Sequence, residues 1–259
     1  MTLVCTFYGT SAAVPSLKRG FSCIGLADSK TPEAPQILLD CGDGSIRNLL
    51  KFGASVEKIS TVLITHFHSD HVTGLTQVIE TMGIRKKKTN LLVLGPPGLG
   101  EYFTMIEKIT SVASHREFQI QFQELSTAQS FKFEDFTATS FQMEHSIPCL
   151  GYRIVGNDGK VLAFTGDTIP CPDVIPLGAD ADLFIHEATY LQKDHSIARE
   201  PKHSTVLEAA KDGRSAKAKK LVLTHVNDDV ETEEEMIAEA IPEFGKNVTV
   251  AHDGLKVEI

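Results

Sequence analysis

Cysteine is sparse in this sequence and never occurs in a close pair. The five residues are Cys5, Cys23, Cys41, Cys149 and Cys171, an odd number with no Cys-x-x-Cys spacing. This pattern disfavours a disulfide framework, which small secreted domains build from an even number of cysteines. We therefore expect a protein of a reducing compartment, with the cytoplasm as the default.

Long hydrophobic runs are also missing. No apolar stretch approaches the roughly 20 residues that a helix needs to span a bilayer. Residues 1–7 lead directly into a predicted strand and lack the basic region and apolar core of a signal peptide. Both absences predict a cytoplasmic protein with no membrane partner.

Positive charge is the smaller share, because 25 Lys and Arg side chains stand against 34 Asp and Glu, for a formal net charge of −9. This balance disfavours broad non-specific binding to nucleic acids or anionic membranes. The one dense basic run is residues 85–88, Arg-Lys-Lys-Lys. Two interpretations of it remain open, a solvated connection between a helix and a strand or a contact to a substrate phosphate.

The chain is long enough to bury a complete core. With 259 residues, 42% of them hydrophobic, it is predicted to form a single domain, 1–259, of two αβ halves at roughly 1–142 and 143–259. Alternating apolar patterns indicate helices layered over sheet, and the strands from 118 to 142 are expected to be antiparallel. The predicted strands are 3–8, 21–27, 36–39, 61–64, 91–94, 118–122, 130–133, 136–142, 161–164, 182–185 and 221–224, and the predicted helices are 45–52, 72–82, 102–109 and 204–211.

The segment 65–71, Thr-His-Phe-His-Ser-Asp-His, is the densest group of potential metal-ligating side chains in the sequence. It stands between a short apolar strand and a helix-spaced apolar pattern, so its ligands are presented at the end of a strand. Imidazole and carboxylate without thiolate suit zinc, with manganese or iron as alternatives. A histidine-rich surface loop is the competing interpretation. The candidate ligands are His66, His68, Asp70 and His71.

Strands in the second half end in the same way. The apolar runs 161–164, 182–185 and 221–224 lead to Asp167, to His186-Glu187 and to His225, and His145 follows the strand 136–142. We expect one rim to collect these side chains. The other histidines are not predicted to be ligands, since His115 and His195 fall in polar loops, His186 is expected to tether its strand end, and His252 is expected near the site.

The Thr-His-x-His-x-Asp-His segment resembles the signature of the metallo-β-lactamase superfamily, and nearly the whole chain is similar to its ribonuclease Z branch, zinc phosphodiesterases that trim tRNA 3′ ends. That resemblance implies an α/β fold, a four-layer αββα sandwich with a binuclear metal site at one edge. The His-Glu-Ala-Thr and His-Ser-Thr segments narrow the substrate class to phosphodiesters. The motifs that carry the resemblance are 9–15, 39–44, 65–71, 95–98, His145 with Pro148 and 151–153, 166–168, 186–189, 203–205 and 223–225.

The resemblance also implies two Zn²⁺ per chain and a homodimer. Asp70 would orient or deprotonate the attacking water, and His203, held by Glu187, would stabilise charge or give a proton. A buried ion pair or a helix cap is the competing interpretation of Glu187 and His203. The implied ligands are His66, His68 and His145 for one ion, Asp70, His71 and His225 for the other, and Asp167 bridging.

The sequence departs from the ribonuclease Z pattern where that family grips tRNA. Only a short hairpin connects 151–153 to 166–168, where the family carries a long arm, and residues 226–231 are acidic where the family is basic. Gly20 stands where asparagine is usual, after the retained Lys18-Arg19. Three functions follow: a ribonuclease Z-like phosphodiesterase with a tRNA precursor as its candidate substrate, a hydrolase of a small cyclic phosphodiester, lactone or thioester, and a scaffold without catalysis.

Overall fold

The computed structural model describes residues 3–110, 116–228 and 232–259, and the chain divides into two compact units. Unit 1 comprises residues 1–10, 17–125 and 253–258, and unit 2 comprises residues 11–16, 126–252 and 259. The two units meet in sequence at Leu125 and Ser126, earlier than the predicted division at 142, because the strands from 130 to 143 pair within unit 2. Among the described residues no helix is long and apolar enough to cross a membrane. The single-domain organisation stays a prediction.

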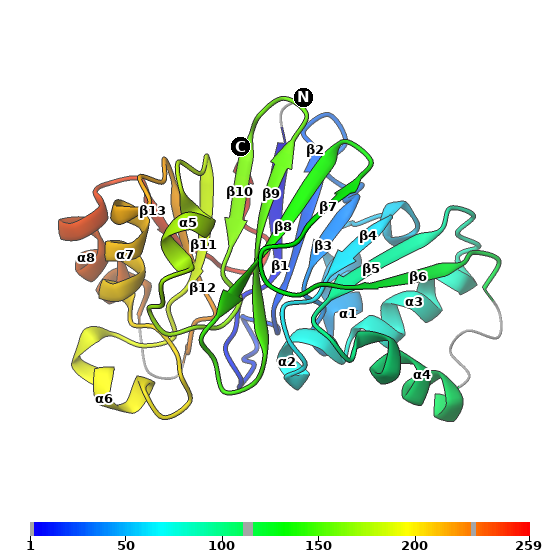
Figure 1. Ribbon diagram of the computed structural model, residues 1–259, viewed down its shortest axis with the longest axis horizontal. Helices are drawn as coiled ribbons and strands as arrows, with labels where there is room; N and C mark the ends of the chain where they lie inside the picture. The colour runs from blue at the N-terminus through cyan, green and yellow to red at the C-terminus, as the bar shows by residue number, and fades with distance from the viewer. Residues whose placement is uncertain (1–2, 111–115, 229–231) are drawn as a thin grey trace. The chain divides into compact units, whose positions relative to one another are not determined.

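Unit 1 is built on a seven-stranded mixed sheet with the order β14-β1-β2-β3-β4-β5-β6 (Figure 1). Neighbouring strands are parallel from β3 to β6 and antiparallel at the other pairings. The parallel central strands are short and apolar on both faces, as strands covered on both sides are. The strands are β1 Leu3–Gly9, β2 Cys23–Asp28, β3 Ile37–Leu39, β4 Thr61–Leu63, β5 Leu91–Gly95, β6 Ile120–Glu124 and β14 Lys256–Glu258.

The helices of unit 1 bury their apolar faces against this sheet. Leu49, Leu75, Val78 and Met82 join Val62 and Val93 in one buried cluster. At roughly 25 cal/mol per Å² of apolar surface removed from water, such burial is the main force that holds these helices on the sheet. The helices are α1 Ser45–Lys51, η1 Val56–Lys58, α2 Ser69–Val72, α3 Leu75–Ile84 and α4 Leu99–Thr110.

Unit 2 repeats the arrangement with a second seven-stranded sheet, in the order β13-β12-β11-β10-β9-β8-β7. Neighbouring strands are parallel from β10 to β13 and antiparallel from β7 to β10. The carboxyl ends of β10, β11 and β12 therefore meet at one edge of this sheet. The strands are β7 Ser130–Phe133, β8 Phe136–Met143, β9 Cys149–Gly156, β10 Val161–Phe164, β11 Leu183–Glu187, β12 Leu221–Thr224 and β13 Val248–Val250.

The helices of unit 2 include α5 and α8, which the sequence analysis did not predict. Helix α7 begins after Thr205, two residues later than predicted, because the Thr205 hydroxyl and the Glu208 carboxylate form a capping box. Helix α8 begins with the same device at Thr232 and Glu235. The helices are α5 Val174–Gly178, η2 Gln192–Asp194, α6 His195–Ala198, α7 Val206–Ser215 and α8 Glu233–Phe244.

Two further sequence predictions, the direction of one strand and the place of one histidine, are wrong. Strand β6 pairs parallel with β5 in the first sheet, whereas the pattern of residues 118–122 was expected to mark an antiparallel strand. An edge strand exposes one face in either direction, so alternation does not report its orientation. His195 begins α6 and does not lie in a loop.

The helix predicted over 72–82 is broken into α2 and α3 at Gly74. An added Cβ on Gly74 would lie 1.9 Å from the carbonyl oxygen of Gly42, and one on Gly42 would lie 2.1 Å from that of Asp70. The backbone N–H of Gly74 donates to the carbonyl of Cys41 at 2.9 Å. Side chains cannot fit where these backbones touch, so the two glycines fix the segment that carries Asp70 against the loop after β3.

Candidate metal and phosphodiester site

Four of the predicted site residues lie in unit 1, after β4. His66 and His68 stand in the loop, whereas Asp70 and His71 belong to α2. Nε2 of His66 lies 3.0 Å from Nδ1 of His68, and Nε2 of His71 lies 3.5 Å from Oδ2 of Asp70. Two ligands of a tetrahedral zinc stand roughly 3.4 Å apart at metal distances of about 2.1 Å. These side chains are therefore spaced as pairs of ligands are.

Asp40 orients this group, and the sequence analysis did not single it out. It directly follows β3 and is fully buried, and its Oδ2 lies 2.7 Å from Nδ1 of His71. Thr65 donates its backbone N–H and its hydroxyl to the same carboxylate, at 2.8 and 3.0 Å. Burial raises the pKa of Asp40, and the neighbouring His71 acts in the opposite direction. With Nδ1 held by a carboxylate, Nε2 of His71 is left as its candidate ligand atom.

A sequence signal for Asp40 existed. It is a carboxylate directly after a buried strand, the same pattern that pointed to Asp167 and His225 in the other half. Its φ of 57° lies in the left-handed region that residues other than glycine rarely adopt, and His225 shares this feature with a φ of 58°. Such backbone geometry is concentrated at functional sites, where the surrounding structure enforces it.

Unit 2 gathers its predicted ligands around Asp167, which follows β10. Oδ2 of Asp167 lies 3.5 Å from Nε2 of His225, 3.8 Å from Nε2 of His145 and 3.9 Å from Nδ1 of His203. All four side chains are buried. Ligand atoms of Asp167, His203 and His225 lie within 4.8 Å of one another. The ends of β8, β10 and β12 and the loop before α7 thus bring together one carboxylate and three imidazoles that are far apart in sequence.

Hydrogen bonds fix the orientation of the predicted ligand imidazoles in unit 2. Nδ1 of His145 lies 3.0 Å from the carbonyl oxygen of Lys202, and Nδ1 of His225 lies 2.9 Å from the hydroxyl of Thr189. A proton on Nδ1 leaves Nε2 as the free coordinating nitrogen. Burial lowers the pKa of His145 and so keeps its imidazole neutral, the form that binds a metal. Sequence reasoning missed Lys202 because its contribution is a backbone carbonyl.

Glu187 and His203 form the pair that the sequence analysis predicted. Oε1 of Glu187 lies 2.9 Å from Nδ1 of His203 and accepts the backbone N–H of Thr168 at 2.8 Å. Burial disfavours the Glu187 charge, but the adjacent His203 outweighs it and holds the pKa of Glu187 below its ordinary value. The helix-cap interpretation is excluded, because Thr205 caps α7. Glu187 therefore holds His203 beside Asp167 as a charged hydrogen-bond acceptor.

The donor set fits the metal that the sequence predicts. It consists of buried imidazoles and carboxylates, which suit zinc, manganese or iron, and each of His71, His145 and His225 has its second nitrogen held by a polar group. When bound, divalent ions of this kind polarise a phosphoryl oxygen and lower the pKa of a coordinated water.

The predicted basic run is partly structural. Lys87 is buried, and its Nζ donates to the carbonyl of Glu57 at 3.1 Å and to the hydroxyl of Thr89 at 2.7 Å. Arg85 and Lys88 are exposed enough to reach a phosphate, although each also faces a glutamate. The phosphate-contact interpretation is thus wrong for Lys87, whose ammonium stabilises the loop itself.

The unusual Gly20 has a physical explanation. Its N–H donates to Oδ2 of Asp253 at 2.7 Å, and the side-chain amide of Asn48 donates to the same oxygen at 3.0 Å. A Cβ on residue 20 would lie only 2.5 Å from that amide nitrogen. Arg19 is also buried, where it donates to the Thr10 hydroxyl at 2.9 Å, so it anchors the loop from inside.

His186 tethers its strand, as the sequence predicted. It is fully buried, with Nδ1 2.6 Å from the carbonyl oxygen of Glu187 and Nε2 3.4 Å from Oδ2 of Asp212 on α7. Burial opposes a charged imidazole, but Asp212 and the carbonyl of Glu187 prevail and raise the pKa of His186. His252 is exposed, and His115 lies outside the described residues.

Stability is therefore expected to depend on pH through His186. Because its folded pKa is raised, its contribution is complete below the unfolded value of about 6.5 and is lost as pH rises through the folded pKa. His186→Asn should lower the free energy of unfolding by about 3 kcal/mol at pH 6 and by less as pH rises. Urea unfolding of both proteins across pH 6–9 measures this. His195→Asn is the control, because it removes an imidazole that is half exposed and lies outside the core. A difference that stays constant over this range would contradict a charged His186.

Comparison with known proteins places this geometry in a family. Residues 36–226 match the family model described as the β-lactamase superfamily domain. The ribonuclease Z of Methanothermobacter thermautotrophicus is 31% identical, over 98% of this chain and 96% of the relative, and that of Myxococcus xanthus is 28% identical over 98% and 97%. The first alignment extends over 301 positions against 259 residues here, so the relative has segments that this chain lacks.

Solved structures agree with this assignment. The short form of human tRNase Z is 29% identical, with a TM-score of 0.82 over 98% of both chains. The metallo-β-lactamase fold protein YhfI of Bacillus subtilis is 22% identical, with a TM-score of 0.85 over the whole of both chains, and supports the fold. In this chain the residues 157–160 alone connect β9 to β10, so the family's arm is absent at that place. The chain belongs to the metallo-β-lactamase superfamily, in the ribonuclease Z-like branch without the arm, and is a metal-dependent hydrolase.

Proposed function

We propose that this protein is a binuclear zinc phosphodiesterase that cleaves tRNA precursors at their 3′ ends. The observation that carries the proposal is the orientation of His71, His145 and His225, each with Nδ1 held by a polar group, in a chain of the ribonuclease Z branch. The ligands would be His66, His68 and His145 for one ion, Asp70, His71 and His225 for the other, and Asp167 for both.

Two side chains, Asp70 and His203, would act on the attacking water and on the phosphate. Asp70 would orient the attacking water and accept its proton, since a carboxylate is ionised near neutral pH and the bound ions would lower the pKa of that water. His203, held by Glu187 at 2.9 Å, would donate to the phosphate oxygens as charge develops or protonate the leaving oxygen. Both roles act on the transition state and not on binding alone.

The tRNA part of the proposal rests on the relatives. Proteins named ribonuclease Z match over almost the full chain, and the short form of human tRNase Z shares the fold at 29% identity. The homodimer implied by the resemblance is part of the same proposal, and cytoplasmic location stays a prediction.

A small phosphodiester is the second candidate substrate. The short β9–β10 connection and the buried Arg19 and Lys87 favour it, because they remove basic side chains that a long RNA would contact. The same catalytic groups would serve either substrate.

One experiment separates these candidates. The zinc-loaded protein is assayed against a tRNA precursor with a 3′ trailer, against bis(p-nitrophenyl) phosphate and against a lactone, with metal content measured by elemental analysis. We expect two zinc ions per chain and hydrolysis of both phosphodiesters. Cleavage of the small phosphodiester alone would assign the second candidate, and hydrolysis of the lactone alone would overturn the proposal. Less than one ion per chain would overturn the ligand assignment.

Asp40 gives an independent test of the metal site. Asp40→Asn keeps the size of the side chain and removes the charge that holds Nδ1 of His71, so zinc affinity should fall by about 10–100-fold. Competition with a chromophoric chelator measures this without an activity assay. Asp43→Asn is the matched control at an exposed residue three positions away, and equal affinities in the two variants would contradict an orienting role for Asp40.

A further inference from the structure

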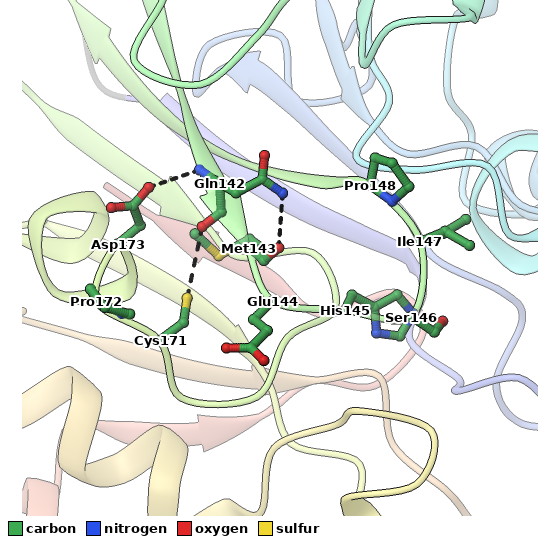
Figure 2. Close-up of a pocket in the computed structure, with 10 residues that line it drawn as sticks. All are labelled: Gln142, Met143, Glu144, His145, Ser146, Ile147, Pro148, Cys171, Pro172 and Asp173. Atoms are coloured by element: carbon green, nitrogen blue, oxygen red, sulfur yellow. Dashed lines mark hydrogen bonds between the residues drawn. The ribbon is translucent and has the colours of Figure 1, made fainter.

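Unit 2 contains a cavity of about 550 Å³ beside His145, between two loops (Figure 2). One wall is the segment from Gln142 to Pro148, which includes His145, and the other is the segment from Cys171 to Asp173, which begins four residues after Asp167. The backbone N–H of Ile169 donates to the carbonyl of Glu144 at 3.1 Å and joins the two loops. Both loops therefore carry a predicted metal ligand and a wall of the cavity, and its volume is typical of a small-ligand site.

The cavity offers flat apolar surface. Ile147, Pro148 and Pro172 contribute hydrocarbon, and the Cys171 thiol donates to the carbonyl of Gln142 at 3.8 Å. Figure 2 shows Ile147 and Pro148 on one side of the opening and Cys171 and Pro172 on the other. Proline rings and a polarisable sulfur pack well on an aromatic ring. This lining thus favours an aromatic ligand.

The charges in the cavity exclude a phosphate there. Its ionisable side chains other than His145 and Cys171 are the carboxylates of Glu144 and Asp173. Asp173 already accepts the backbone N–H of Gln142 at 3.0 Å, whereas Glu144 is exposed and lies 3.8 Å from Nζ of Lys202. A carboxylate repels an anion but accepts a hydrogen bond from an amino group, as glutamate does from the N4 amino group of cytosine.

We propose that this cavity binds the nucleobase next to the scissile phosphate, with a preference for a base that carries an exocyclic amino group. The inference rests on the proposed phosphodiesterase function, because it uses His145 as the boundary between the phosphate site and the base site. The base lies against the prolines and the Cys171 thiol, and its amino group donates to Glu144. This gives an enzyme without the arm a local means of recognising a nucleotide.

Three synthetic substrates test the proposal. They are the p-nitrophenyl phosphodiesters of deoxycytidine, of thymidine and of methanol, which share the leaving group. The first carries a base with an exocyclic amino group, the second a base without one, and the third no base. Wild type should show the highest kcat/KM on the deoxycytidine ester, with the methyl ester at least 10-fold lower. Cys171→Phe, which fills the cavity, should remove this advantage through KM and leave the methyl ester unchanged. Ile147→Trp is a second blocking variant in case the first does not fold.

Glu144→Gln tests the proposed hydrogen bond from the amino group of the base to Glu144. It should reduce the preference for deoxycytidine over thymidine several-fold, whereas Glu200→Gln, at an exposed glutamate outside the cavity, should not change it. Equal rates on all three esters in wild type, or an equal loss on all three in Cys171→Phe, would overturn the base site while leaving the phosphodiesterase intact.

Binding gives a readout that does not need turnover. Deoxycytidine alone should perturb NMR signals of residues 143–148 and 171–173 in wild type and not in Cys171→Phe. Hydrolysis of none of the esters would overturn the proposed function, and lack of nucleoside binding would overturn this inference separately.

Discussion

Replacing Asp70 by alanine is expected to lower phosphodiesterase turnover by roughly 10²–10⁴-fold, the usual contribution of a positioned acid or base. The side chain is buried beside His71, with Oδ2 3.5 Å from Nε2, so the variant would lose both a proposed metal ligand and the proposed base. The loss should appear in kcat, because the carboxylate acts on water that becomes nucleophilic only in the transition state. Steady-state kinetics on bis(p-nitrophenyl) phosphate at saturating zinc measure it.

Asp43→Ala is the matched control for this change. Asp43 is exposed on the turn after Asp40, so its removal should leave kcat within a factor of about two and the fold intact. Circular dichroism and the urea midpoint of Asp70→Ala establish that the fold survives. A wild-type rate in Asp70→Ala would show that the metals alone position the water.

His203→Ala is expected to reduce kcat by about 10²–10³-fold while zinc content stays at its wild-type value. Its imidazole is held by Glu187 at 2.9 Å and lies 3.9 Å from Asp167, a proposed metal ligand. Its proposed role is to donate to the substrate phosphate and not to bind metal. Charge on the phosphate oxygens grows in the transition state, so a donor there changes kcat more than KM.

Two further variants locate the cause of that effect. Glu187→Gln removes the charge beside His203 and keeps one of the two oxygens that accept the N–H groups of Thr168 and Ser204, so its kcat should fall less than that of His203→Ala. His195→Ala removes an imidazole on α6 that is half exposed and serves as the control. If His203→Ala loses zinc, the residue is a ligand and its assignment to the phosphate is wrong.

Some features of this protein are determined by short-range sequence. The strand, loop and helix around 61–84 are readable because β-branched residues precede the histidines and helix-spaced apolar residues follow them. Asp167, Glu187 and His225 are visible because each follows a buried apolar run, and buried strands of an α/β fold present their carboxyl ends at a common edge. These features depend on periodicity and local chemistry, which the chain carries in itself.

Other features were decided by tertiary structure alone. The break at Gly74 follows from contact with the backbone of Gly42, more than thirty residues away, and Asp40 acquires its role from Thr65 and His71. Lys202 acts on His145 through a backbone carbonyl, which has no residue-specific signature. The direction of β6 was hidden for a related reason, since pairing depends on a partner strand and not on the strand's own pattern. Sequence thus determines which side chains can take part in the chemistry, whereas their protonation and orientation depend on neighbours that only folding brings within hydrogen-bond distance.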